Sequence, residues 1–229
     1  MVHTMRPLLV YIKMKLLELF SGTKSVSKIA VELGWEVVSL DLKGADINCN
    51  ILDWDYRQYE PGSFDIIWAS PPCNCFSHFR KCLLGRFGIT EESIQNDIEN
   101  IALPVLYKTL EIIDYLKPKY YFIENPQTGR MKEYMDRPFY DVDYCQYSDW
   151  GYRKRTRILT NLQSFSPKRC HKHCANKDGT KHRVRLDWPT TKLRDRYRIP
   201  PMLIQELFSL TGVTHPMIMS EAHPSKWNG

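Results

Sequence analysis

The chain has 229 residues and a formal net charge of +6; 43% of its residues are hydrophobic and 25% charged, which is typical of a soluble globular protein. This length accommodates one well-cored domain with a small addition. No apolar stretch is long enough to span a bilayer, and the segment from Met5 to Phe20 contains two lysines and lacks the small-residue cleavage site of a signal peptide. We therefore expect an intracellular protein, of cytoplasm or nucleus, without membrane attachment.

The first two-thirds of the chain alternates short apolar runs with segments of helical periodicity, which is typical of a mostly parallel sheet covered by helices. We predict strands over Lys15–Phe20, Glu36–Asp41, Phe64–Ala69 and Tyr120–Glu124. We predict helices over Val26–Leu33 and Glu91–Leu116, the second kinked or split at Pro104 because proline interrupts a helix. The predicted fold class is α/β and Rossmann-like.

The pattern changes after the fourth of these strands. Two more strands are expected, over Val142–Tyr147 and Arg157–Thr160. Residues 163–187 are polar and basic and have little periodicity. A final helix is expected to start at Pro200 or Pro201 and to end at Leu210, because proline is favoured in a first helical turn.

Positive charge is concentrated in one segment, Trp150–Pro200. This segment contains 15 lysines and arginines and three acidic residues, a net charge of +12, so the rest of the chain carries about −6. Such an asymmetry is typical of a surface that contacts nucleic acid. Charge alone does not distinguish DNA from RNA.

A ligand site is predicted where the first strands end, because ligands of open α/β sheets bind outside the carboxyl ends of the strands. Gly22 follows the first strand and allows a sharp turn beside a ligand. Asp41 ends the second strand, where a carboxylate can accept hydrogen bonds from a ribose, and Asp53 follows, where it could contact an adenine amino group. Together these residues indicate an adenosine-containing cofactor.

A candidate nucleophile follows the strand Phe64–Ala69, which leads directly into Ser70-Pro-Pro-Cys73. The two prolines stiffen this loop and hold the thiol of Cys73 at the ligand-binding edge. Most cysteines in proteins are inert, buried, small hydrophobic residues. We interpret three others in that way: Cys49, Cys82 and Cys145.

Four short motifs lie in order along the predicted core: Phe20-Ser-Gly22, Ser70-Pro-Pro-Cys73 with Phe76-Ser77, Glu124-Asn125-Pro126 and Arg155-Thr-Arg157. Over residues 15–160 they resemble the first cofactor motif, the nucleophile loop, the Glu-Asn motif and the late arginine motif of the cytosine carbon-5 DNA methyltransferase family. The resemblance implies a Rossmann-like methyltransferase fold and S-adenosyl-L-methionine as the methyl donor. It also implies duplex DNA with a flipped cytosine as the substrate.

The resemblance also implies roles for single residues. Carbon-5 of cytosine attacks a methyl donor only after a thiolate has added to carbon-6 and made the ring enamine-like. Cys73 would be that thiolate, and Glu124 would hold the Watson–Crick edge of the base. Arg155 and Arg157 would bind the ring carbonyl and a nearby phosphate, for which a guanidinium fork is suited.

The resemblance also implies which residues contact the cofactor and the nucleic acid, and how the chain is divided into a core, an insert and a C-terminal segment. The expected cofactor-binding residues are Phe20, Ser21, Gly22, Thr23, Asp41, Leu42, Asp53, Ser70 and Pro71. The expected nucleic-acid contacts are Asn74, Ser77, Arg153, Lys154, Lys168, Arg169 and Lys172.

We expect a catalytic core over 1–160, a short basic target-recognition insert over 161–198, and a C-terminal helix with a tail over 199–229. An insert of this size offers few elements for reading base edges, so we expect a short recognition sequence or a partner protein that assists.

The insert also contains potential metal ligands. Cys170 and Cys174 are spaced C-x3-C, and with His173 or His171 and with His182 they could supply the four ligands of a structural zinc ion. This is not a standard zinc-finger spacing. The alternative is a basic loop in which these residue types occur by chance.

Two other functions stay open. A catalytically silent DNA-binding relative could serve as a partner subunit, although the presence of Cys73, Glu124 and Arg155 together favours an enzyme. The same chemistry could also methylate cytosine in RNA.

Overall fold

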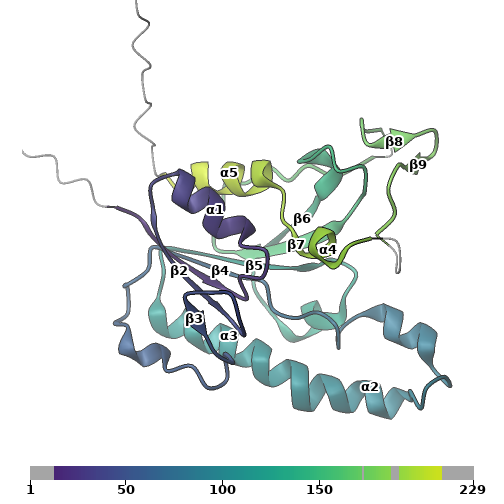
Figure 1. Cartoon of the computed structure of the whole chain (residues 1–229), viewed down its shortest axis with the longest axis horizontal. Helices are drawn as coiled ribbons and strands as arrows, with labels where there is room; N and C mark the ends of the chain where they lie inside the picture. Colours follow the sequence, from purple (N-terminus) through teal and green to yellow (C-terminus); the bar gives the residue numbers. More distant parts are fainter. Residues whose placement is uncertain (1–12, 172, 187–190, 213–229) are drawn as a thin grey trace, which may run out of the picture.

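A computed structural model of the chain describes residues 13–171, 173–186 and 191–212. Its centre is a seven-stranded sheet in the order β3-β2-β1-β4-β5-β7-β6 (Figure 1). The strands are β1 Lys15–Leu19, β2 Glu36–Asp41, β3 Ile47–Asn48, β4 Ile66–Ala69, β5 Tyr120–Pro126, β6 Phe139–Asp143 and β7 Arg155–Thr160. Strands β1 to β5 pair in parallel, and β7 is antiparallel to both of its neighbours, β5 and β6. The predicted mostly parallel sheet is confirmed.

Helices cover both faces of this sheet. The α-helices are α1 Ser25–Glu32, α2 Glu91–Asp97, α3 Leu103–Leu116, α4 Leu193–Tyr197 and α5 Pro201–Ser209. Short 3-10 or π turns lie at η1 Tyr56–Gln58, η2 His78–Leu83, η3 Ile98–Ala102, η4 Arg130–Tyr134 and η5 Tyr144–Gln146. Helices α1 and α5 pack on one face and α3 on the other (Figure 1). The long predicted helix is divided as expected: the π turn η3 separates α2 from α3, whose first turn contains Pro104.

The apolar core explains why the last helix returns to the sheet. Trp68 on β4 stacks on Phe122 of β5 with 5.3 Å between ring centroids. Phe208 of α5 contacts both rings, at 6.3 and 6.2 Å. All three side chains are almost completely buried, and burying each large apolar side chain stabilises the fold by about 2 kcal/mol.

One strand prediction is wrong in position. The sequence favoured a strand over Val142–Tyr147, but β6 starts at Phe139 and ends at Asp143, and η5 follows. The physical reason is a long-range charge pair, because the guanidinium of Arg157 donates to both carboxylate oxygens of Asp141 at 2.8 and 3.0 Å. This pair allows an acidic residue to lie within a strand.

The sheet order also determines where a ligand binds. From β1 the chain extends the sheet on one side through β2 and β3, and then crosses to the other side for β4 and β5. The connections that leave the carboxyl ends of β1 and β4 therefore run to opposite sides and open a crevice above these paired strands. Hydrogen bonds hold the loops that leave these strands: Ser70 N donates to Leu19 O at 3.2 Å, and Ser21 N donates to Leu40 O at 3.1 Å.

The basic insert contains a hairpin of its own, β8 Lys177–Asp178 and β9 Lys181–His182, at the periphery of the molecule (Figure 1). Gly179 lies in its turn with φ +59°, a conformation that favours glycine. Within the described part of the chain, no helix is both long and apolar enough to cross a bilayer.

Candidate active site

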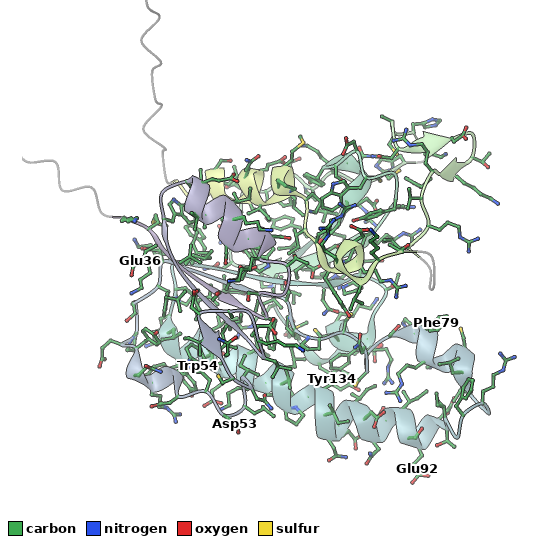
Figure 2. The ribbon with its side chains drawn as sticks, viewed as in Figure 1. Glu36, Asp53, Trp54, Phe79, Glu92 and Tyr134 are labelled. Carbon is green, nitrogen blue, oxygen red and sulfur yellow. The ribbon has the colours of Figure 1, made fainter. Side chains whose placement is uncertain are left out.

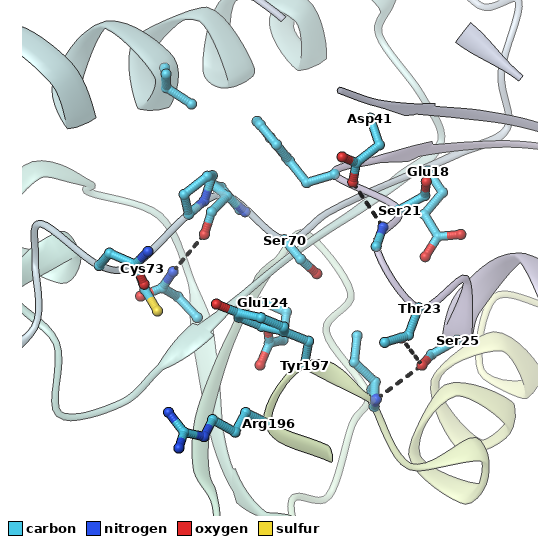
Figure 3. Close-up of a pocket in the computed structure, with 18 of the residues that line it drawn as sticks. Glu18, Ser21, Thr23, Ser25, Asp41, Ser70, Cys73, Glu124, Arg196 and Tyr197 are labelled. Atoms are coloured by element: carbon cyan, nitrogen blue, oxygen red, sulfur yellow. Dashed lines mark hydrogen bonds between the residues drawn. The ribbon is translucent and has the colours of Figure 1, made fainter. Parts of the chain in front are cut away.

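A cavity of about 840 Å³ opens at the carboxyl ends of β1, β2, β4 and β5. This volume lies within the range of about 300 to 1,000 Å³ that is usual for ligand sites. Figure 3 shows two halves of the cavity, with Ser21, Thr23 and Asp41 in one and Cys73 and Glu124 in the other. The first half has the character of a cofactor site, and the second carries the reactive groups.

The turn after β1 is fastened to the end of β2 by Asp41. Gly22 N donates to one carboxylate oxygen of Asp41 at 2.9 Å, and Leu42 N donates to the other at 2.7 Å. Phe20, with φ +59°, and Gly22, with φ +43°, give the turn its tight shape. A carboxylate oxygen can accept more than one hydrogen bond, so Asp41 keeps acceptor capacity toward a bound ligand.

Eight of the nine predicted cofactor residues line this cavity, namely Phe20, Ser21, Gly22, Thr23, Asp41, Leu42, Ser70 and Pro71. Asp53 does not. Its side chain is exposed on the outside of the loop that follows β3 (Figure 2), because a turn in which Asp53 N donates to Asn50 O carries it away. The cavity wall is formed instead by Cys49, Asn50 and Ile51.

Glu18 is a cavity-lining residue that the sequence analysis missed. It lies on β1 among Leu16, Leu17 and Leu19, and only 3% of it is exposed. Its carboxylate accepts hydrogen bonds from the backbone N and the hydroxyl of Ser27 on α1. Burial nevertheless raises the pKa of Glu18 to about 7. An isolated acidic residue within a buried strand is the signal that could have indicated it.

The raised pKa of Glu18 predicts a pH-dependent stability. The folded protein holds this proton up to about pH 7, while the unfolded chain releases it near its ordinary pKa of 4.5. The contribution of protonated Glu18 to the free energy of unfolding is therefore fully present below pH 4.5. It falls by on the order of 3 kcal/mol as the pH rises to about 7. We expect Glu18→Gln to match wild type near pH 4.5 and to exceed its free energy of unfolding by about that amount at pH 8.

Urea unfolding of the cofactor-free protein at both pH values measures this difference. Glu32→Gln on α1 is the control, because its carboxyl is exposed and surface substitutions usually change stability by less than about 0.5 kcal/mol. An equal effect of Glu18→Gln at both pH values would contradict a buried carboxyl that titrates near neutrality.

The predicted nucleophile loop, which carries Cys73, is fixed to the sheet and to a small apolar cluster. Asn125 at the end of β5 donates from its side-chain amide to Pro71 O at 3.3 Å. Phe76 N donates to Cys73 O at 3.1 Å, and the ring of Phe76 is completely buried against Tyr134. The thiol of Cys73 is thus held at the cavity by contacts on both sides of it. No separate role was predicted for Asn125 within the Glu124-Asn125-Pro126 motif.

Glu124, the predicted partner of the nucleophile, is 6% exposed at the end of β5. Two donors bind the same carboxylate oxygen: the hydroxyl of Tyr144 at 2.9 Å and the ammonium of Lys154 at 3.1 Å. Because both donors are themselves mostly buried, the carboxylate has a defined orientation and is charge-paired.

The same groups influence the thiol. Burial raises the pKa of Cys73, and the nearby carboxylate of Glu124 raises it further, while the ammonium of Lys154 lowers it. In the free protein Cys73 is therefore mainly a thiol at neutral pH. Loss of the Glu124 charge is expected to lower the pKa of Cys73, and loss of the Lys154 charge is expected to raise it.

The predicted arginine pair lies elsewhere. In the antiparallel pairing of β5 with β7, Glu124 is opposite Ile158 and Asn125 is opposite Arg157. Residues directly opposite one another share a face of the sheet and neighbours alternate, so Arg155 and Arg157 lie on the face that Glu124 does not. Neither lines the cavity: Arg157 pairs with Asp141, and Arg155 is exposed.

The predicted nucleic-acid contacts are divided between the cavity and the surface. Asn74, Ser77 and Lys154 line the cavity. Arg153 instead forms a paired hydrogen bond with Asp143, and Lys168 pairs with Glu206 of α5. Arg169 is exposed, and Lys172 lies outside the described residues.

Two residues of α4 were missed. Arg196 and Tyr197 line the catalytic half of the cavity (Figure 3). The available signal was their place in the basic insert, just before the last helix expected to start at Pro200 or Pro201.

The predicted metal ligands are also rearranged. The structure brings Cys145, Cys170, Cys174 and His182 together, with ligand atoms that all lie within 4.8 Å of one another. His171 and His173 are exposed and lie outside this group. The fourth member is therefore Cys145, which the sequence analysis had interpreted as inert.

The sheet order, with one antiparallel strand next to its last edge, and the cavity at its switch point define the protein as a Rossmann-like methyltransferase in fold. The chain belongs to the C-5 cytosine-specific DNA methylase family, whose model matches residues 40–161. A protein of Frog virus 3 (isolate Goorha) described as a probable DNA (cytosine-5)-methyltransferase is 46% identical over 213 residues, which are 86% of this chain and 100% of that protein.

Solved structures similar to this chain include two methyltransferases. One is EhMeth of Entamoeba histolytica, with a TM-score of 0.48 and 17% identity over 68% of this chain and 55% of that one. Another is Dnmt2 of S. pombe, with a TM-score of 0.43 and 14% identity over 68% of this chain and 51% of that one. The chain spans about half the length of these two structures.

Proposed function

We propose that this protein transfers a methyl group from S-adenosyl-L-methionine to carbon-5 of cytosine in DNA, with Cys73 as the covalent nucleophile. One observation carries the proposal. A conformationally fixed Pro-Pro-Cys loop, a buried carboxylate and a buried ammonium lie in the same cavity as the glycine turn that Asp41 fastens. Each part has a role in this reaction, and the family to which the chain belongs catalyses it.

The cofactor half of the cavity fits S-adenosyl-L-methionine, which supplies a methyl group on a positively charged sulfur. Asp41 has acceptor capacity for ribose hydroxyls, and its bonds to Gly22 N and Leu42 N preorganise the turn. Leu42 and Ile51 offer apolar surface for a purine ring. Ser70 and Pro71 lie where the cofactor half meets Cys73.

The chain's own groups perform the covalent steps. The thiolate of Cys73 forms a bond to carbon-6 of cytosine, while Glu124 accepts a hydrogen bond from the exocyclic amine and shares a proton with the ring nitrogen, which stabilises the electron-rich ring. Carbon-5 would then take the methyl group as the methyl–sulfur bond of S-adenosyl-L-methionine breaks, and S-adenosyl-L-homocysteine would leave. Loss of the carbon-5 proton to a base or to water breaks the bond between carbon-6 and sulfur, restores the aromatic ring and regenerates the thiolate.

Lys154 and Arg196 take the cationic roles that the sequence analysis gave to Arg155 and Arg157. Lys154 is close enough to Glu124 to orient it and stabilises the thiolate of Cys73. Arg196 lies beside the catalytic half and would bind the ring carbonyl or the phosphate of the flipped nucleotide. Arg155 and Arg169 are exposed and suit contacts with the DNA backbone.

A tritium-transfer assay tests the proposal. Purified full-length protein is incubated with methyl-labelled S-adenosyl-L-methionine and, separately, with unmethylated duplex DNA, single-stranded DNA or transfer RNA. We expect label in the DNA, recovered as 5-methylcytosine after digestion. Label only in RNA would replace the DNA substrate, and a folded protein that binds no S-adenosyl-L-methionine would favour the silent partner subunit.

A further inference from the structure

Cys145, Cys170, Cys174 and His182 form a compact group outside the active site. Cys145 lies in η5, directly after β6 of the catalytic sheet, whereas Cys170 and Cys174 lie in the insert and His182 on β9. The group therefore joins the core to the insert. We propose that these four residues bind one structural zinc ion, which holds the basic insert to the catalytic sheet.

The separations among the ligand atoms of Cys170, Cys174 and His182 match a tetrahedral zinc site, and the sulfur of Cys145 lies within 4.8 Å of all three. With zinc–sulfur bonds of about 2.3 Å and zinc–nitrogen bonds of about 2.0 Å, sulfur atoms lie about 3.8 Å apart and sulfur and nitrogen about 3.5 Å apart. The sulfurs of Cys170 and Cys174 are 3.7 Å apart. His182 Nε2 is 3.7 Å from the first and 3.3 Å from the second. Three cysteines and one histidine are a known ligand set of structural zinc.

The part of the insert from 166 to 186 lacks an apolar core that could replace such an ion. Among the described residues of 166–186, only Cys170 and Asn176 are buried. The hairpin β8–β9 has two residues in each strand, and an isolated hairpin is at best marginally stable in water. Small segments of this kind are usually fastened by disulfides or a metal. The 3.7 Å between the two insert sulfurs is too long for a disulfide.

Polar contacts connect this group to the active site. Cys170 N donates to Asp143 at 2.7 Å, and the same carboxylate accepts both bonds from Arg153. The amide of Asn176 donates to Cys145 O and Ser148 O and accepts from Gly151 N. These bonds fix residues 143–153, and the next residue along the chain is Lys154. The zinc ion would therefore stabilise the segment that carries the lysine bound to Glu124.

Metal analysis of purified full-length protein without a histidine tag tests the site. We expect one zinc per chain in wild type, where binding deprotonates three thiols and releases their protons to the buffer. Cys145→Ser lacks one of these three thiols and should therefore lose the zinc. His173→Ala is the matched control and should keep its zinc, since His173 lies outside the group. A zinc-free, folded wild type after refolding with zinc would overturn the proposal, as would zinc retained by Cys145→Ser and lost by His173→Ala.

Two measurements on wild type remain decisive if Cys145→Ser does not fold. Cobalt substitution should produce thiolate-to-cobalt charge-transfer absorption and the intense bands of a tetrahedral ion. Removal of the metal with a chelator should make residues 166–186 sensitive to trypsin while the core stays protected. Octahedral cobalt spectra, an insert unaffected by chelation, or a disulfide between Cys170 and Cys174 in the folded protein would each overturn the site.

Discussion

Replacement of Cys73 by alanine is expected to reduce methyl transfer by on the order of 10⁶-fold, the loss that follows removal of a covalent nucleophile in well-studied enzymes. Without the thiol, carbon-5 of cytosine has no means of becoming nucleophilic. The tritium-transfer assay measures the loss. Cys73 is only half-buried in a loop, so the variant should fold and bind S-adenosyl-L-methionine as wild type does.

Cys82→Ala is the matched control, because Cys82 is exposed in η2 and does not line the cavity. Duplex DNA containing 5-fluorocytosine provides a second readout, since fluorine at carbon-5 cannot leave as a proton does and the adduct persists. Wild type should form a covalent complex with this DNA, and Cys73→Ala should not. Substantial transfer by a folded Cys73→Ala protein would exclude Cys73 as the nucleophile.

Glu124→Gln is expected to separate the reactivity of the thiol from catalysis. The amide cannot supply the charge or the proton that stabilises the ring, and a loss of about 10²- to 10⁴-fold in transfer is expected for a group with this role. Removal of the same negative charge lowers the pKa of Cys73, because the Glu124 carboxylate is one of the causes that raise it. The thiol should therefore become more reactive while the enzyme becomes slower.

The rate of alkylation of Cys73 by iodoacetamide, followed by mass spectrometry across pH, measures the thiolate fraction. The profile should move to lower pH in Glu124→Gln and to higher pH in Lys154→Met, because Lys154 lowers the pKa of Cys73. Lys28→Met, an exposed position on α1, should leave the profile unchanged. Shifts of Glu124→Gln and Lys154→Met in the same direction would contradict the electrostatic arrangement of the site.

Most of the cavity-lining residues at the strand ends were predictable from the sequence because their signals are local. Gly22, Asp41 and Cys73 each lie at or within a few residues of the end of a short apolar run, and the carboxyl ends of neighbouring parallel strands meet at one edge of a sheet. Their convergence on one cavity needs no knowledge of long-range pairing beyond that rule. The division of the long helix by the π turn just before Pro104 was likewise indicated by local backbone chemistry.

The positions of side chains that depend on long-range pairing could not be predicted from such local signals. The face on which Arg157 lies is determined by the register of β7 against β5, and a shift of one residue would reverse it. Cys145 joins Cys170 across 25 residues of chain, which no spacing pattern indicates. The sequence by itself thus determined the class of fold and which residues gather at the strand ends. Tertiary structure alone decided that Lys154 reaches Glu124 and that Cys145 joins the other three candidate metal ligands. The physical reason is that strand register and the long-range path of the chain, not local propensity, place those side chains.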